Sequence, residues 1–263
     1  MSQRLIKTEE EIAKIKEGGK KIATILVELG TMVKPGLHTS KLEHHALMRI
    51  EEEGGRPAFK GYKTSPQSQP FPTALCISIN DEIVHGPALP GRVLKEGDII
   101  SIDVGMEYPA HNGYFTDTAI TVPVGKINKE TKKLVEATYD ALYAGIKAAK
   151  PGNTLDDIGC AVEAIAKKNK LGVIRDLVGH GVGLAVHEDP QVPNYHITKG
   201  EFPNVELKPG MVIAIEPMFT LGDWHIDTAA DGFTFVTADG SLSAHFEHTI
   251  VITKNGNEII TKK

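Results

Sequence analysis

The first stretch of the chain repeats apolar residues with a helical period. These residues recur at roughly helical spacing over 12–29, which predicts an amphipathic helix over about 8–33. Thr8 and Glu11 have the spacing of a capping box, in which each side chain binds the other residue's backbone N–H. Lys34-Pro35-Gly36 then ends the helix, because proline does not continue a helix and glycine allows a turn.

A second helix is predicted from Thr39 or Ser40 to Glu53, followed by two glycines. Ser40 and Glu43 have the spacing of another capping box. His44 and His45 lie within this helix. We interpret both as surface or packing histidines, because no other ligand type lies three or four residues further along.

Beyond the second helix the pattern changes to strands. Residues 56–75 are rich in proline, serine and glutamine and show no periodicity, which predicts an exposed loop. Two more helices are predicted, at about 129–149 and 154–170. Strands are predicted at 75–79, 83–85, 99–104, 118–124, 173–178, 211–216, 233–237 and 248–253.

Four short motifs occur twice in the same order, which indicates an internal repeat. They are Lys34-Pro35-Gly36 and Lys150-Pro151-Gly152, Val84-His85 and Val186-His187, the segments 94–103 and 207–216, and the segments 115–118 and 246–249. We therefore predict a single domain over residues 1–263, with halves at approximately 8–125 and 126–263. Its fold class would be α+β, a duplicated helix-and-strand unit with pseudo-twofold symmetry around an antiparallel sheet.

The repeat places one carboxylate at the end of an apolar strand in each half. These are Asp103 and Glu216, and a second matched pair is Asp117 and Glu247. Burying an acid is costly unless it is paired or binds a metal. A pseudo-twofold axis would bring all four carboxylates together, where cations are needed to offset their repulsion. The alternative is that the acids face water on edge strands.

The segment 178–190 contributes histidine to this picture. It contains His180 between Gly179 and Gly181, and His187 seven residues later. His187 has a counterpart in His85 of the first half, whereas His180 has none, so His180 is predicted as a fifth ligand. Four carboxylates and one imidazole suit two divalent ions such as Mn, Fe, Co or Zn.

Composition limits the remaining possibilities. A hydrophobic content of 41% and a charged content of 24% fit a globular protein. The net charge of −5 argues against direct nucleic-acid binding. There is no apolar run long enough for a membrane span and no signal-peptide pattern. Cys76 and Cys160 both lie in apolar stretches, which predicts two buried thiols and a cytoplasmic location.

The chain closely resembles the type I methionine aminopeptidases of the pita-bread metallopeptidase family. The resemblance covers about residues 6–261. It rests on the segments 76–80 (Cys-Ile-Ser-Ile-Asn), 84–86 (Val-His-Gly), 102–104 (Ile-Asp-Val), 117–118 (Asp-Thr), 179–183 (Gly-His-Gly-Val-Gly), 187–192 (His-Glu-Asp-Pro-Gln-Val), 215–218 (Ile-Glu-Pro-Met) and 247–250 (Glu-His-Thr-Ile).

The resemblance implies roles for particular residues. Glu216 would be both a metal ligand and the acceptor of the proton from the attacking water. His187 would hold the substrate backbone, and His85 would hydrogen-bond the reacting amide. The metal ligands would be Asp103, Asp117, His180, Glu216 and Glu247, and the methionine pocket would be lined by Phe59, Tyr62, Cys76, Val186 and Phe233. For Cys76, plain core packing is an equal alternative.

The resemblance also implies a function. The enzyme would use two divalent ions (Co, Mn, Fe or Zn) to remove the N-terminal methionine from nascent polypeptides at the ribosome, before a small second residue. It would act in the cytoplasm as a monomer. The rival interpretations are an Xaa-Pro aminopeptidase or prolidase, which would usually carry an additional N-terminal domain, and a non-catalytic binding module on the same fold.

Three features depart from the family pattern. The loop over 63–73 is longer than usual, and 106–112 reads as a lengthened hairpin between Asp103 and Asp117. Lys60 and Phe115 stand where histidines are customary. These departures leave the predicted ligands intact and affect the expected pocket rim.

Overall fold

The computed structural model describes residues 4–198 and 200–263. The first helix, α1, spans Glu9–Met32, and both hydrogen bonds of the Thr8–Glu11 capping box form. The second helix, α2, spans Ser40–Glu52, but the capping box predicted for Ser40 and Glu43 is wrong. Glu43 is buried and accepts hydrogen bonds from the backbone N–H groups of Ala74 and Leu75. Glu43 therefore binds backbone groups that are distant in sequence and does not cap its own helix.

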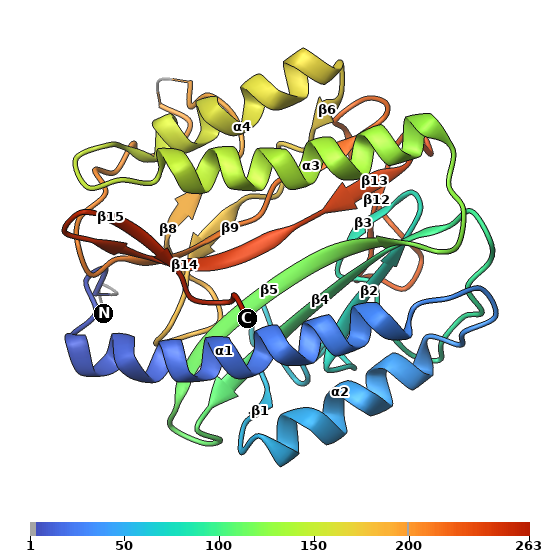
Figure 1. The fold of residues 1–263 in the computed structure, drawn as a ribbon, viewed down its shortest axis with the longest axis horizontal. Helices are drawn as coiled ribbons and strands as arrows, with labels where there is room; N and C mark the ends of the chain where they lie inside the picture. Colours follow the sequence, from blue (N-terminus) through green and yellow to red (C-terminus); the bar gives the residue numbers. More distant parts are fainter. Residues whose placement is uncertain (1–3, 199) are drawn as a thin grey trace.

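A large antiparallel sheet forms the centre of the molecule (Figure 1). Its main path runs in the order β1-β4-β5-β14-β9-β7-β8, with β2 paired to β4 and β15 paired to β14. The bounds of these strands are β1 Arg56–Pro57, β2 Leu75–Ile79, β4 Ile99–Tyr108, β5 Tyr114–Pro123, β7 Gly179–Gly181, β8 Glu188–Val192, β9 Val212–Ile215, β14 Glu247–Thr253 and β15 Gly256–Ile259.

Two smaller sheets and two further helices complete the fold. One sheet has the order β13-β10-β6 and the other β11-β12-β3. The helices are α3 (Lys129–Ala148) and α4 (Leu155–Asn169), as predicted within one or two residues. The remaining strands are β3 Glu82–Val84, β6 Gly172–Val173, β10 Met218–Thr220, β11 Ile226–Thr228, β12 Phe235–Thr237 and β13 Ser243–His245.

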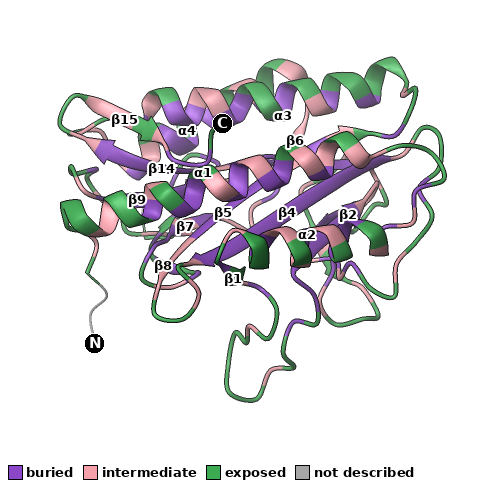
Figure 2. Ribbon diagram, turned by 60° about the horizontal axis from the view of Figure 1, so that its bottom comes forward, coloured by how far each residue is buried: buried purple, intermediate pink, exposed green. Residues whose placement is uncertain are grey.

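In the described ranges, helices α1, α2, α3 and α4 cover the same face of the large sheet (Figure 2). One core lies under α1 and α2 and includes Ile100 and Ile102 of β4. A second core lies under α3 and α4 and includes Ile213 of β9 and Ile250 of β14. Because side chains alternate along a strand, the neighbouring positions point to the opposite face. That opposite face is where the predicted carboxylates lie.

The two halves repeat the same backbone contacts. Gly36 N–H donates to Leu94 O at 2.8 Å, and Gly152 N–H donates to Leu207 O at 3.0 Å. Both glycines have a positive φ, of 83° and 87°, which glycine adopts without strain. The repeated Lys-Pro-Gly motif therefore makes the same turn in each half. In both halves its glycine N–H binds the segment that leads into a sheet strand, β4 or β9.

Several sequence predictions need correction. The strands predicted at 99–104 and 118–124 are parts of a longer hairpin, since pairing continues to Tyr108 and Tyr114. The strand predicted at 173–178 shrinks to two residues. Cys160 is exposed, so only Cys76 is a buried thiol. The 56–75 loop is mostly exposed, but Phe59 and Phe71 within it are buried. No helix in the described ranges is long and apolar enough to cross a bilayer.

The partly buried histidine His248 predicts a measurable pH effect. Its Nδ1 lies 3.0 Å from Thr261 Oγ1 and its Nε2 lies 3.3 Å from Tyr143 Oη. Burial lowers the pKa of His248 from 6.5 to about 4. As the pH falls below 6.5, this histidine takes up a proton in the unfolded chain before it does so in the folded protein. The contribution of His248 to the free energy of unfolding is therefore lost as the pH falls from 6.5 through 4.

We expect the stability of His248→Gln relative to wild type to show this loss directly. Glutamine keeps polar atoms but does not titrate. The difference in free energy of unfolding between wild type and the variant should therefore decrease by at most about 3 kcal/mol between neutral and acidic pH. The measurement is urea unfolding of both metal-free proteins at several pH values. Other titrating groups are common to the two chains and cancel in the difference. Identical pH slopes would contradict the lowered pKa of His248.

Candidate active site

A large cavity of the described chain lies on the sheet face that the helices leave open. Its volume is about 920 Å³. All five predicted metal ligands line it, together with both of the predicted catalytic histidines. The ligands Asp103, Asp117, His180, Glu216 and Glu247 come from or adjoin β4, β5, β7, β9 and β14.

Strand register explains why the carboxylates meet. Asp103 of β4 pairs with Ala119 of β5, and Ala119 pairs with Glu247 of β14. Cys76 of β2 pairs with Asp103 from the other side. These four residues therefore form one row across four adjacent strands. Ala119 lies between the two acids, and its methyl group leaves space between their carboxylates.

Two threonines connect the central strands around Asp117 and Glu247. Thr249 Oγ1 donates to the backbone oxygen of Asp117 at 2.8 Å and lies 3.2 Å from its Oδ1. Thr118 Oγ1 donates to the backbone oxygen of Glu247 at 2.8 Å. A threonine one residue after Asp117 and another two residues after Glu247 thus each bind the backbone of the other acid. This exchange fixes the relative position of the two carboxylates.

His180 presents one ring nitrogen to the carboxylates. Its Nδ1 lies 2.9 Å from the Gly181 carbonyl oxygen, which only accepts, so Nδ1 carries the proton. Its Nε2 lies 3.4 Å from both Asp117 Oδ2 and Glu216 Oε1. Burial lowers the pKa of His180 to about 4, so the ring is neutral and Nε2 carries a free lone pair. A backbone bond of this kind is typical of metal-binding histidines.

Glycines allow the His180 strand to approach its neighbours. A Cβ at Gly179 would lie 2.4 Å from the Ala214 carbonyl oxygen of β9, and a Cβ at Gly181 would lie 2.1 Å from the Asp189 carbonyl oxygen. Side chains at these positions would force the strands apart. The Gly-His-Gly motif therefore serves close backbone packing beside the carboxylates.

The electrostatics of the cluster call for cations. Burial, followed by repulsion from neighbouring carboxylates, raises the pKa of Asp103, Glu216 and Glu247 well above their usual values. Burial raises the pKa of Asp117 to about 6. Asp103 Oδ1 is buried with no hydrogen-bond partner among the described residues. Ligand atoms of Asp117, His180 and Glu247 lie within 4.8 Å of one another. The residues present therefore fit divalent metal ions.

The two other predicted histidines lie over the carboxylate cluster. The His187 ring contacts the His180 ring edge to face at 4.5 Å, and its Nδ1 lies 2.8 Å from Tyr62 Oη. His85 follows β3 with a φ of 61° and packs its ring 5.5 Å from Phe235. Burial lowers the pKa of both histidines to about 4, so both are neutral near pH 7.

The loop that joins His180 to His187 is anchored by a buried ion pair. Glu188 Oε1 accepts hydrogen bonds from the N–H groups of Leu184 and Ala185, between His180 and His187. Its Oε2 lies 2.5 Å from Lys7 Nζ, and both side chains are only 1% exposed. The sequence prediction included neither Lys7 nor a structural role for Glu188, because they lie 181 positions apart.

The predicted pocket residues gather beside the cluster. Phe59, Tyr62, Cys76 and Phe233 line the cavity. Val186 does not line it, but packs into the same apolar cluster behind Phe59 and Cys76. Phe71 was missed, and it contacts Phe233 edge to face at 5.6 Å. The proline, serine and glutamine residues around Phe71 led to the prediction of an exposed loop there.

His245 is a second residue that sequence reasoning missed. It is 1% exposed, and its ring nitrogens have no hydrogen-bond partner among the described residues. Its Nε2 lies 3.7 Å from Glu216 Oε2. Burial lowers the pKa of His245 to about 3, so a neutral ring stands behind Glu216. The only sequence signal was a histidine two residues before Glu247.

Comparison with known proteins agrees with this geometry. Residues 13–254 match the model of metallopeptidase family M24. The chain is 45% identical to methionine aminopeptidase 1 of Bacillus subtilis, covering 98% of this chain and 99% of that protein. It is 46% identical to a methionine aminopeptidase of Aquifex aeolicus, covering 97% of each.

Solved structures extend the comparison to the fold. A methionine aminopeptidase of Thermotoga maritima matches with a TM-score of 0.91 and 43% identity, covering 100% of both chains. A prolidase of Pyrococcus furiosus matches with a TM-score of 0.73 and 25% identity, covering 99% of this chain and 66% of that one. These matches confirm the predicted pita-bread α+β fold. The chain therefore belongs to metallopeptidase family M24 and, within that family, to the methionine aminopeptidases.

Proposed function

We propose that this hydrolase uses two divalent cations to remove the N-terminal methionine from polypeptides whose second residue is small. The observation that carries the proposal is the convergence of four carboxylates and the free Nε2 of His180 at the wall of one cavity. The relatives named methionine aminopeptidases support the substrate class. The metals proposed are Co, Mn, Fe or Zn, which these oxygen and nitrogen ligands suit.

Asp103, Asp117, His180, Glu216 and Glu247 would hold the cations. When bound, the cations would supply Lewis acidity to the scissile carbonyl and lower the pKa of a bound water toward ~7. Glu216 would accept the proton at a carboxylate oxygen, and two contacts support this role: Oε1 lies near His180 in the cluster and Oε2 lies near the neutral His245 ring.

The two remaining histidines would bind the substrate. Tyr62 Oη fixes the His187 ring through Nδ1, which leaves Nε2 for the substrate backbone. His85 lines the same cavity beside Phe235 and would hydrogen-bond the reacting amide. Both rings are neutral, so each can donate through one nitrogen without adding charge near the cations. Such preorganised donors are typically worth about 3–4 kcal/mol each in the transition state.

The apolar part of the cavity suits the methionine side chain. Phe59, Phe71 and Phe233 supply ring faces and edges, and Cys76 supplies a thiol whose pKa burial raises well above its usual value. A neutral, polarisable lining favours a flexible thioether, because sulfur–aromatic contacts add about 0.3–1.5 kcal/mol. We further propose that nascent polypeptides at the ribosome are the natural substrates, and that the enzyme acts in the cytoplasm as a monomer.

A peptide series tests the proposal. With Mn(II) or Co(II) added, Met-Ala-Ser should be cleaved after methionine, whereas Leu-Ala-Ser and Met-Leu-Ser should be cleaved much more slowly. Removal of metal by a chelator should abolish cleavage, and the added ion should restore it. Ala-Pro serves as the probe of the rival prolidase activity. Cleavage of Ala-Pro without release of methionine from Met-Ala-Ser would overturn the proposal.

A further inference from the structure

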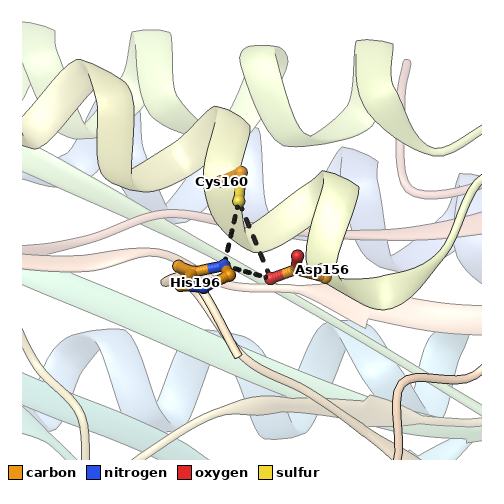
Figure 3. A group of neighbouring side chains, drawn as sticks. All are labelled: Asp156, Cys160 and His196. Atoms are coloured by element: carbon orange, nitrogen blue, oxygen red, sulfur yellow. Dashed lines mark hydrogen bonds and ion pairs between the residues drawn. The ribbon is translucent and has the colours of Figure 1, made fainter. Parts of the chain in front are cut away.

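Three metal-binding side chains of different chemistry meet on the outer surface of α4, away from the carboxylate cluster. Asp156 and Cys160 lie four residues apart on α4, so they share one helix face. His196 reaches them from the segment after β8 (Figure 3). None of the three is among the residues that line the large cavity, and the mechanism above uses none of them.

The three ligand atoms point at one another. Cys160 Sγ lies 3.6 Å from Asp156 Oδ1 and 3.5 Å from His196 Nδ1, and His196 Nδ1 lies 2.9 Å from Asp156 Oδ1. Metal–ligand bonds of ~2.3 Å to sulfur and ~2.0–2.2 Å to nitrogen and oxygen, at tetrahedral angles, separate ligand atoms by roughly 3.4–3.6 Å. Both sulfur distances already have this value, and the third, at 2.9 Å, needs an opening of roughly half an ångström.

We propose that Asp156, Cys160 and His196 form a second metal site, separate from the predicted catalytic centre, for a zinc-like divalent cation. One thiolate, one imidazole and one carboxylate are a ligand set that suits Zn²⁺, Co²⁺ or Cd²⁺ better than Mg²⁺ or Ca²⁺. Binding replaces the thiol proton with a metal–sulfur bond, and the proton goes to solvent.

The geometry argues against a nucleophilic cysteine at this place. In a catalytic triad the acid and the nucleophile bind opposite nitrogens of the histidine ring. Here Cys160 and Asp156 both approach Nδ1 of His196. One ring nitrogen cannot relay a proton between them, whereas one cation can bind all three. Burial and then the Asp156 carboxylate raise the pKa of the Cys160 thiol, whereas a catalytic thiol needs a lowered pKa.

The surroundings of the three side chains orient the carboxylate and leave the site open to solvent. Asp156 Oδ1 also accepts a hydrogen bond from Ile197 N–H at 2.7 Å, which orients the carboxylate as outer partners do in metal sites. A second cavity, of about 420 Å³, opens beside Cys160 and His196. It leaves room for a water molecule as a fourth ligand. Cys160 is exposed, so an ion can enter from solvent.

Cobalt titration of the full-length protein tests the proposal. Wild type should bind one Co²⁺ that gives the near-ultraviolet charge-transfer absorption of a cobalt–thiolate bond. Cys160→Ser should lose this absorption, and His196→Ala should weaken its apparent affinity by at least about tenfold. Because Cys76 lies beside Asp103, Cys76→Ser is the matched control and should retain the absorption. Melting curves of the variants establish that each is folded.

Alkylation gives an independent measurement. Iodoacetamide should label Cys160 in the metal-free protein, and Zn²⁺ should protect it in wild type but not in His196→Ala. Wild type without thiolate absorption, an unchanged absorption in Cys160→Ser, or labelling that Zn²⁺ does not slow would each overturn the proposal. The three side chains would then be only a hydrogen-bonded connection between α4 and the segment after β8.

Discussion

Glu216→Gln is expected to reduce kcat/KM for Met-Ala-Ser by about 10²–10⁴-fold, the usual contribution of a general base. Glutamine keeps the size of the side chain but cannot accept a proton. It also removes one negative charge from a cluster in which Glu216 approaches His180 Nε2 at 3.4 Å. Loss of charge should lower metal affinity as well, so rates must be measured at saturating Mn(II) or Co(II).

The same variant should fold at least as well as wild type when metal is absent. Burial and the carboxylates of Asp117 and Asp103 raise the pKa of Glu216, which means that its charged form is destabilised in the folded state. A neutral amide removes that penalty. The exposed Glu258→Gln, on β15, is the matched control and should change neither rate nor stability appreciably. Turnover of Glu216→Gln within tenfold of wild type would contradict the proton-acceptor role.

Lys7→Met is expected to destabilise the protein by about 3–5 kcal/mol, the cost of leaving one charge of a buried pair alone. The Lys7 Nζ–Glu188 Oε2 distance is 2.5 Å with both side chains 1% exposed. Without Lys7, the buried Glu188 carboxylate keeps only its backbone N–H donors from the loop before it. That loop joins His180 to His187, so kcat/KM should fall together with stability.

A second ion pair of the same chemistry gives the control. Lys16 Nζ lies 2.5 Å from Glu258 Oε2, but the side chains are 31% and 50% exposed, and exposed pairs contribute about 0–1 kcal/mol. Urea unfolding should therefore separate Lys7→Met from Lys16→Met by several kcal/mol. The double variant Lys7→Met/Glu188→Gln should recover part of the loss, because no buried charge remains unpaired. Equal effects of the two lysine substitutions would show that burial of the Lys7 pair is unimportant.

Local pattern was sufficient for the helices. The Thr8–Glu11 box formed as predicted, and α3 and α4 lie within one or two residues of their predicted ranges. Their signals, helical spacing of apolar residues and caps at fixed offsets, involve only near neighbours in sequence. The Ser40–Glu43 box failed for the opposite reason, since Glu43 binds backbone groups 31 and 32 residues away.

The internal repeat was sufficient to predict the four carboxylates as candidate ligands. The family resemblance was needed to predict their roles. Matched positions in two copies of one unit must be related by its symmetry axis, so Asp103 and Glu216 could be paired from sequence. The row that joins Asp103 to Glu247 through Ala119 required strand register, which a one-residue shift would destroy. No pattern within either strand specifies that register.

Sequence by itself determined the helices, the repeat, the candidate ligands and the family resemblance of this protein, because each depends on residues at short or repeated spacing. Tertiary structure alone decided that Lys7 anchors Glu188, that His245 stands behind Glu216, that Phe71 is buried, and that Cys160 meets His196. These partners lie from 29 to 181 residues apart or depend on burial. Chain folding, not local propensity, brings such groups within a few ångströms of each other.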